Sequence, residues 1–326
     1  MLPPLVFKPY FRPQVWGETR LQRFLGKALP PGGHFGESWE ISAHPHHVSR
    51  VAEGPWTGAA LTDLWSAHRD EFQNPLASSR SPFPLLLKLL DCHEPLSVQV
   101  HPDDDDAREL LGEPNGKTEA WVVLHAEPGS RIYAGLKAGV TRGDLETHLD
   151  RGTVADCLHS FEPRVGDCVL IEAGTVHAVG GGVVLAEVQQ SSDATFRLFD
   201  WNRAGPNGQA RPIHRDAALR CIRWDLGPIS PIRSAPCLCE TCHDEERLIH
   251  GDYFDLSRIH LRATETTFDS ERLTMWLIAS GQAQLRDEAT GYDRRFVAGE
   301  SVLVPAQARH LNWSSEQATL LRVTPA

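Results

Sequence analysis

The chain has 326 residues, 41% of them hydrophobic, so it can bury a large core, and its length favours about two domains of ordinary size. Its formal net charge of -11 argues against a nucleic-acid-binding protein, because such proteins gather Lys and Arg on one surface and carry a basic balance. No run approaches the roughly 20 apolar residues of a membrane-spanning helix, so we expect neither a nucleic-acid nor a membrane partner.

The first residues contain no signal-peptide core, because prolines and the charged Lys8 and Arg12 interrupt the apolar positions. We therefore expect a cytoplasmic protein. Glycine and proline recur between short segments rich in Val, Ile, Leu and Trp, a pattern typical of a mostly β protein. Helical pattern is confined to a few segments, such as residues 61–72 and 141–161, and the second opens on a match to a capping box.

The segment PLSVQVHPDDDD at residues 95–106 alternates as a strand does. Its polar residues Ser97, Gln99 and His101 lie on one face and two valines lie on the other. The valine face indicates a core, and the polar face indicates a barrel interior that holds a ligand. The four aspartates at residues 103–106 are predicted to form a solvated turn and helix start rather than a second metal site.

One segment is repeated between the two halves of the chain, as GDCVLIEAGTVH at residues 166–177 and GESVLVPAQARH at residues 299–310. Both copies have a glycine, an acid, an apolar run, an alanine and a final histidine in the same register. A β unit used twice is expected of two jelly-roll barrels. We therefore predict a mostly β fold of two such barrels with a few decorating helices, divided into residues 1–225 and 226–326.

The similarity continues upstream, where EAWVVLHAEPGSRI at residues 119–132 has its counterpart in TMWLIASGQAQL at residues 274–285, with Trp121 matching Trp276. The two copies differ there at one informative position, because Glu119 is replaced by Thr274. Glu119, His101, His177 and the amide oxygen of Gln99 together suit a divalent, zinc-like ion. Each of them alone has an ordinary structural explanation, as a surface histidine, a solvated charge or a satisfied core residue. The set predicts a metal site because the second copy loses the carboxylate while keeping the scaffold.

Five longer motifs carry a resemblance to a known family: GESWEIS at 36–42, PFPLLLKLLD at 82–91, PLSVQVHPDD at 95–104, GKTEAWVVL at 116–124 and AEVQQSSDATFRLFDWNR at 186–203. In these motifs the chain resembles the type I phosphomannose isomerases, metal-dependent enzymes of the cupin superfamily, and in length it resembles their shorter bacterial branch. The second barrel follows, and GESVLVPA resembles the C-terminal portion of the family. The chain departs from the general cupin motif at Glu172, where that motif has proline.

The resemblance implies an isomerase that interconverts D-mannose 6-phosphate and D-fructose 6-phosphate, with one zinc ion per chain, other divalent metals being possible. It implies a metal-binding catalytic cupin domain followed by a degenerate one. It also implies that the metal ligands are Gln99, His101, Glu119 and His177. The implied catalytic residues are Arg197, Lys117 and Glu187, and the implied phosphate-binding pair is Lys88 and Ser97.

The implied chemistry agrees with these residue types. An aldose–ketose isomerase moves a proton between C1 and C2 and must stabilise the enediolate oxygens that form meanwhile. A metal would do this as a Lewis acid, and Lys117 and Arg197 would add positive charge. The general base is left open among Glu187, Asp193 and the histidines.

Two of the cations have structural alternatives. Lys88 lies in the run LLLKLLD, which predicts that it is buried among leucines, and we expect it to bind phosphate rather than to be a charge at a strand end. Arg197 could instead form a surface ion pair with Asp200.

Two other functions use a similar ligand set. A cupin dioxygenase with iron is disfavoured because an oxygenase has no general need for Lys117, Lys88 and Arg197. A non-catalytic cupin that binds phosphorylated sugars is disfavoured by the intact ligand set beside Arg197. The sequence does not determine the oligomeric state.

The segment CLCETCH places Cys237, Cys239, Cys242 and His243 close together and could form a soft-metal clip. A zinc site usually draws its ligands from two separated pairs, and no second pair is nearby. We therefore expect free thiols in a connector.

Overall fold

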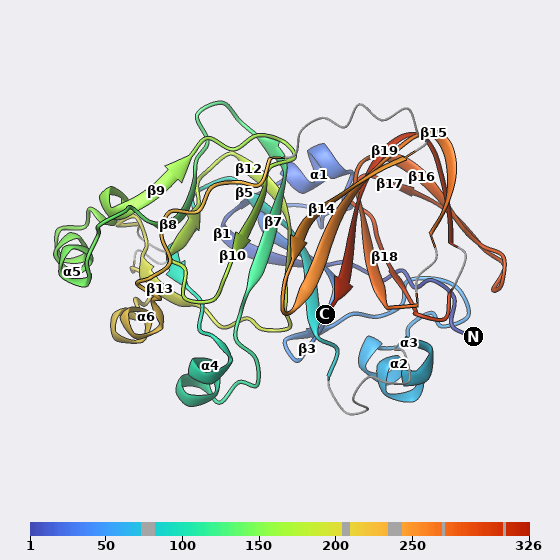
Figure 1. Ribbon diagram of the computed structural model, residues 1–326, viewed down its shortest axis with the longest axis horizontal. Helices are drawn as coiled ribbons and strands as arrows, with labels where there is room; N and C mark the ends of the chain where they lie inside the picture. The colour runs from blue at the N-terminus through green and yellow to red at the C-terminus, as the bar shows by residue number, and fades with distance from the viewer. Residues whose placement is uncertain (73–81, 204–208, 234–242, 269–270, 309–310) are drawn as a thin grey trace.

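The computed structural model describes residues 1–326 apart from 73–81, 204–208, 234–242, 269–270 and 309–310. Two β-barrels lie side by side, the first drawn mainly in cyan, green and yellow and the second in orange and red (Figure 1). This confirms the predicted mostly β fold of two jelly-roll barrels with helices at the periphery.

The first barrel is built from two sheets that enclose a hydrophobic cluster. The six-stranded sheet has the order β1 (Tyr10–Glu18), β2 (Phe35–Ile41), β5 (Leu85–Cys92), β12 (Val183–Gln190), β7 (Glu119–Ala126) and β10 (Cys168–Ile171). The five-stranded sheet has the order β13 (Phe196–Phe199), β6 (Val98–Val100), β11 (His177–Val179), β8 (Ile132–Leu136) and β9 (Leu158–Phe161).

The second barrel has a filled interior. Its strands are β14 (His243–His250), β15 (Phe254–Phe268), β19 (Leu311–Pro325), β16 (Thr274–Asp287), β17 (Tyr292–Val297) and β18 (Ser301–Val304). Trp276, Trp313 and Phe296 are buried there, and the Trp313 ring centroid lies 5.4 Å from that of Trp276 and 5.7 Å from that of Phe296. The final histidine of the repeat, His310, lies outside the described residues.

The helices and two short strands lie around the barrels: α1 (Arg20–Leu25), α2 (Leu61–Ala67), α3 (Arg69–Phe72), α4 (Asp104–Leu111), α5 (Arg142–Arg151), the 3₁₀ helix η1 (Val154–Cys157), α6 (Arg215–Cys221), β3 (Ala43–His44) and β4 (His47–Val48). No helix in the described part of the chain is long and apolar enough to cross a membrane.

The structure corrects the extent of the two predicted helices. Residues 61–72 form two helices that break at His68, not one. The second helix begins as predicted, with Thr141 and Asp144 completing a capping box, but it ends at Arg151. Gly152 follows with φ 68° in the left-handed conformation that closes a helix, so the chain continues into η1 and β9 instead.

One hydrophobic cluster extends across both barrels, in addition to the clusters inside each of them. A single cluster contains Leu87 and Leu89 of β5 together with Met275 and Leu277 of β16. The N-terminal segment also reaches the second barrel, since Leu5 exchanges backbone hydrogen bonds of 2.8 and 2.9 Å with Leu303. The division at residue 225 stays a prediction.

Candidate active site and metal centre

Three strands from the two sheets of the first barrel bring the predicted ligands together. His177 of β11 lies opposite Gln99 of β6, His101 directly follows β6, and Glu119 begins β7. The ligand atoms of His101, Glu119 and His177 all lie within 4.8 Å of one another, and all three side chains are buried. The Gln99 amide nitrogen is 3.2 Å from His177 Nε2, so its side chain reaches the same cluster.

The two imidazoles are oriented by the backbone. His101 Nδ1 donates to the carbonyl of Ala194 and His177 Nδ1 donates to the carbonyl of Thr175, each at 2.9 Å. Because a carbonyl can only accept, Nδ1 carries the proton and Nε2 is left with its lone pair. The Nε2 atoms of His101 and His177 face Glu119, at 3.4 and 3.5 Å from its oxygens.

The charge states of this cluster fit a divalent cation. Burial and then His101 lower the pKa of His177 to about 3, which keeps that ring neutral. Burial alone would raise the pKa of Glu119, but Lys117 and the two histidines outweigh it and hold the pKa well below its ordinary value. Among the described residues, Glu119 Oε1 has no hydrogen-bond donor, and Oε2 contacts only the Lys117 ammonium and His101 Nε2. A charged, under-coordinated carboxylate between two imidazole lone pairs is a donor set for a metal ion.

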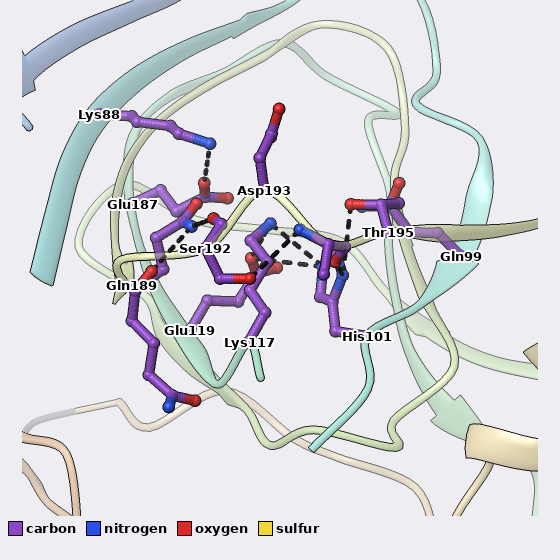
Figure 2. A network of polar contacts seen from close by, with 12 residues as sticks. Lys88, Gln99, His101, Lys117, Glu119, Glu187, Gln189, Ser192, Asp193 and Thr195 are labelled. Carbon is purple, nitrogen blue, oxygen red and sulfur yellow. Dashed lines mark hydrogen bonds and ion pairs between the residues drawn. The ribbon is translucent and has the colours of Figure 1, made fainter. Parts of the chain in front are cut away.

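Lys117 lies at the centre of the site. Its ammonium is 2.7 Å from Glu119 Oε2 and 3.2 Å from His101 Nε2. Burial alone would lower the pKa of Lys117, but Glu119 and Glu187 raise it above its ordinary value, so the ammonium keeps its charge. Figure 2 shows Lys117 and Glu119 between His101 on one side and the Lys88–Glu187 pair on the other.

A cavity of about 290 Å³ opens beside this cluster. It is lined by Arg12, Gln14, Trp16, Glu37, Lys88, Leu90, Leu96, Ser97, Gln99, Lys117, Glu187, Asp193, Thr195, Arg197 and Arg211. The cavity therefore brings together the three predicted catalytic residues, the predicted phosphate-binding pair and one predicted metal ligand. The other three ligands are buried behind it.

Two carboxyl groups in the cavity differ in their affinity for a proton. Burial, followed by the charge of Glu119, raises the pKa of Glu187, whose Oε2 accepts a hydrogen bond from Trp121 Nε1 at 3.0 Å. Burial alone would also raise the pKa of Asp193, but Lys88, Arg12 and Lys117 bring it down to about 2. Asp193 is therefore a fixed negative charge, whereas Glu187 can take up and release a proton nearer neutral pH.

Lys88 is buried as predicted, with 3% of the residue exposed. Its ammonium lies 3.5 Å from Glu187 and 3.8 Å from Glu37, and 4.9 Å from the ring centroid of Trp39. One ammonium is thus shared by two carboxylates and an aromatic face.

The predicted alternative for Arg197, an ion pair with Asp200, does not form. Asp200 is occupied by Arg203 at 2.7 Å and by a bidentate contact from Arg211 at 2.6 and 2.7 Å. Arg197 donates to the carbonyl of Pro212 at 2.9 Å, and no carboxylate of the described residues lies within ion-pair distance of it. Its charge therefore remains uncompensated at the cavity.

Several residues of the cavity were not singled out from the sequence, among them Gln14, Glu37 and Arg211. Glu37 lies in a motif that carries the family resemblance, but nothing in its spacing predicts a role. Gln14 and Arg211 lie in segments without periodicity. Cys237, Cys239 and Cys242, which we expect to be free thiols in a connector, lie outside the described residues.

Comparison with known proteins gives one consistent result. The family model for the catalytic domain of type I phosphomannose isomerase matches residues 5–117. The chain is 32% identical over 309 residues to the mannose-6-phosphate isomerase ManA of Bacillus subtilis, covering 93% of both chains. It is 38% identical over 219 residues to the mannose-6-phosphate isomerase of Streptococcus mutans, covering 67% of both.

The fold agrees with a solved structure over its whole length. The crystal structure of the mannose 6-phosphate isomerase from Bacillus subtilis superposes with a TM-score of 0.88 at 29% identity, covering 99% of each chain.

Proposed function

The chain belongs to the type I phosphomannose isomerases, and we propose that it interconverts D-mannose 6-phosphate and D-fructose 6-phosphate in the cavity of the first barrel. The observation that carries this proposal is the buried cluster of His101, Glu119 and His177 behind a cavity that holds Lys117 and an unpaired Arg197.

The proposed metal ion is one zinc per chain, held by Gln99, His101, Glu119 and His177. When bound, this ion would supply Lewis-acid stabilisation of the negative charge that develops on the sugar oxygens. The fit rests on the two Nε2 lone pairs that face Glu119 and on Glu119 Oε1, which has no hydrogen-bond donor among the described residues.

The remaining electrostatic work is assigned to two cations. Lys117 keeps its charge beside Glu119, and Arg197 pairs with Gln99 in the β13–β6 register, which puts it next to the ligand set. Both cations are positioned to stabilise an oxyanion at C1 or C2. Arg197 can do so without breaking an ion pair, because no carboxylate of the described residues is paired with it.

We assign the proton transfer between C1 and C2 to Glu187. A general base works best when its pKa is near the operating pH, and burial shifts the pKa of Glu187 in that direction. Asp193 is less suited because its pKa of about 2 makes it a weak base. The lone pairs of His101 and His177 are directed at the ligand cluster instead.

The substrate phosphate is assigned to Ser97 and Lys88, with Arg211 as a third contact. All three line the cavity. Ser97 lies two residues before Gln99 on the same face of the segment, and Arg211 presents a guanidinium of the type that binds phosphate well. Lys88 shares its charge with Glu37 and Glu187, and Arg211 forms a bidentate pair with Asp200, so each cation would bind the phosphate in competition with a carboxylate.

The test is direct. The purified protein is incubated with zinc and fructose 6-phosphate, and the formation of mannose 6-phosphate is followed. Turnover that requires the metal and is absent with fructose supports the proposal. Binding without turnover would identify a sugar-phosphate-binding protein instead.

A further inference from the structure

The backbone that carries Lys117 and Glu119 is tied down by three consecutive amides. Gly116 N–H donates to Asp104 Oδ1 at 2.7 Å, and Lys117 N–H donates to the carbonyl of Pro102 at 2.9 Å. The next amide, that of Thr118, donates to Gln190 Oε1 at 2.8 Å. None of these bonds belongs to a strand ladder, so the segment is held by its own set of acceptors.

Asp104 is the centre of this set. Besides the Gly116 amide, its Oδ1 accepts from Gln190 Nε2 at 2.9 Å, so the two side-chain acceptors of the segment are bonded to each other. No Lys, Arg or His of the described residues lies within ion-pair distance of Asp104. The Asp104 carboxylate therefore accepts hydrogen bonds from uncharged donors, and its negative charge makes these bonds stronger than hydrogen bonds between two uncharged groups.

The second barrel completes the arrangement. Tyr253, in the turn between β14 and β15, donates its hydroxyl hydrogen to Asp104 Oδ2 at 3.3 Å. The second barrel therefore contacts Asp104 directly, and Asp104 is bonded to the segment that carries Lys117 and Glu119.

The path of the chain leaves little freedom at this point. A Cβ on Gly116 would lie 2.3 Å from the carbonyl carbon of Asp103, so the backbone of the segment passes directly against the start of α4. This close approach explains why glycine precedes Lys117, and it presses the segment against the carboxylate that anchors it.

Accurate placement of this segment matters because it carries two functional side chains that can be displaced only slightly without loss of function. Lys117 and Glu119 must hold their positions relative to His101, and active-site groups need to stay within roughly 0.5 Å of their working geometry. A misplacement of about 1 Å can cost on the order of 100-fold in rate.

We propose that Asp104 is a positioning residue for the isomerase, which fixes the segment carrying Lys117 and Glu119 through Gln190 and is itself held by Tyr253 of the second barrel. The inference rests on the proposed function for its catalytic consequence. It also has a consequence that does not depend on turnover, namely tighter retention of the metal by Glu119.

Asp104→Ala removes the anchor, and Asp103→Ala is its matched control. Asp103 is the neighbouring acid and caps α4 by accepting from the amides of Asp105 and Asp106, but it has no bond from its side chain to the segment. Both variants therefore disturb the start of α4, and only the first releases the amide of Gly116.

Five quantities are measured for each variant: kcat and KM for fructose 6-phosphate, the rate of zinc release to a chelator without substrate, hydrogen exchange at the amides of Gly116 and Thr118 in the metal-free protein, and the unfolding midpoint. For Asp104→Ala we expect kcat to fall and zinc release to accelerate by roughly 10–100-fold, the range for residues that orient metal ligands, with little change in KM. Exchange at the two amides should accelerate as well.

The control should lower the unfolding midpoint while leaving kcat, zinc release and exchange at Gly116 as in the wild type. Tyr253→Phe keeps the ring and removes one hydroxyl, and it should lower kcat by roughly two- to tenfold, the size expected for one hydrogen bond. Asp104→Asn keeps an acceptor for Gly116 and should recover part of the loss. These two variants test the proposal even if Asp104→Ala fails to fold.

Wild-type zinc release and exchange in Asp104→Ala would overturn the proposal, and so would equal losses in Asp103→Ala. Absence of isomerase activity in the wild type would contradict the proposed function alone, because zinc release and exchange still report on the role of Asp104.

Discussion

Glu119 and Thr274 occupy the same position in the strand pairing of the two barrels. Glu119 pairs with Ile171 of β10 and Thr274 pairs with Val304 of β18, and these two partners are equivalent residues of the repeated segment. In the first barrel the carboxylate joins the ligand cluster. In the second, the Thr274 hydroxyl accepts the indole hydrogen of Trp276 at 2.9 Å, so the position is closed by a local bond.

This relationship predicts the metal content. We expect one divalent ion per chain, because the second barrel has a hydroxyl and packed aromatic rings where the first has a carboxylate and a cavity. Metal analysis of the purified protein should give one equivalent, and His101→Ala should lose it. Two equivalents per chain, or unchanged occupancy in His101→Ala, would contradict the assignment.

Arg197→Ala should fold and keep its metal but lose roughly 10²–10³-fold in kcat, the usual effect of removing one donor to a developing oxyanion. The reason is that, within the described residues, the Arg197 side chain makes one hydrogen bond, to a backbone carbonyl, and has no carboxylate partner. Steady-state kinetics and metal analysis measure both effects.

The control for Arg197 is Arg215→Ala on α6, which removes an exposed arginine paired with Asp150 and should change nothing in turnover. Near-wild-type kcat in Arg197→Ala would mean that the residue is structural.

The pH dependence follows from Glu187. As a base it must be ionised, so activity should fall as the pH drops through its pKa, and burial places that pKa above the ordinary value. The acid limb of kcat/KM should therefore lie above about 4.3, the reference for glutamate, and Glu187→Gln should abolish turnover while metal is retained. An acid limb at or below the reference value would reassign the base.

The clustering of His101, Glu119 and His177 could be predicted because these residues lie in or beside short strands whose alternation is visible locally. Gln99 and His101 share the face opposite two valines, and the contrast between Glu119 and Thr274 distinguishes the working copy. The repeat is confirmed by the pairing of β7 with β10 and of β16 with β18.

The cavity wall could not be predicted in the same way. Glu37 arrives through the pairing of β2 with β5, and Arg211 through the segment after β13, so both depend on long-range closure of the barrel. The N-terminal residues likewise join the second barrel by a bridge between Leu5 and Leu303 that no local pattern announces. The helix predicted at 141–161 is too long, because the apolar periodicity continues past Gly152, the glycine that ends the helix in the structure.

Replacing Lys88 tests whether its charge sets the pKa of Glu187. Lys88→Met keeps the apolar stem over Trp39 and removes the ammonium from Glu37 and Glu187. Because Lys88 lowers the pKa of Glu187, its loss should raise that pKa further, and the acid limb of kcat/KM should move to higher pH. A limb that stays in place would contradict the assignment of Glu187 as the base.

The same variant measures the share of Lys88 in phosphate binding. If its ammonium contacts the phosphate, KM for fructose 6-phosphate should rise, and Arg211→Gln should raise KM as well if the guanidinium now paired with Asp200 also reaches the phosphate. Removing the ammonium also leaves the buried Glu187 carboxylate without its ion-pair partner, while Glu37 keeps Arg12 at 3.6 Å, and this should cost about 3–5 kcal/mol of unfolding free energy near neutral pH. That cost should shrink at acid pH, where Glu187 takes up a proton. Denaturation and steady-state kinetics on one preparation separate the two roles. A lowered unfolding midpoint with an unchanged KM would mean that Lys88 serves only as an internal partner of Glu37 and Glu187. Phosphate binding would then be assigned to Ser97 and Arg211 alone.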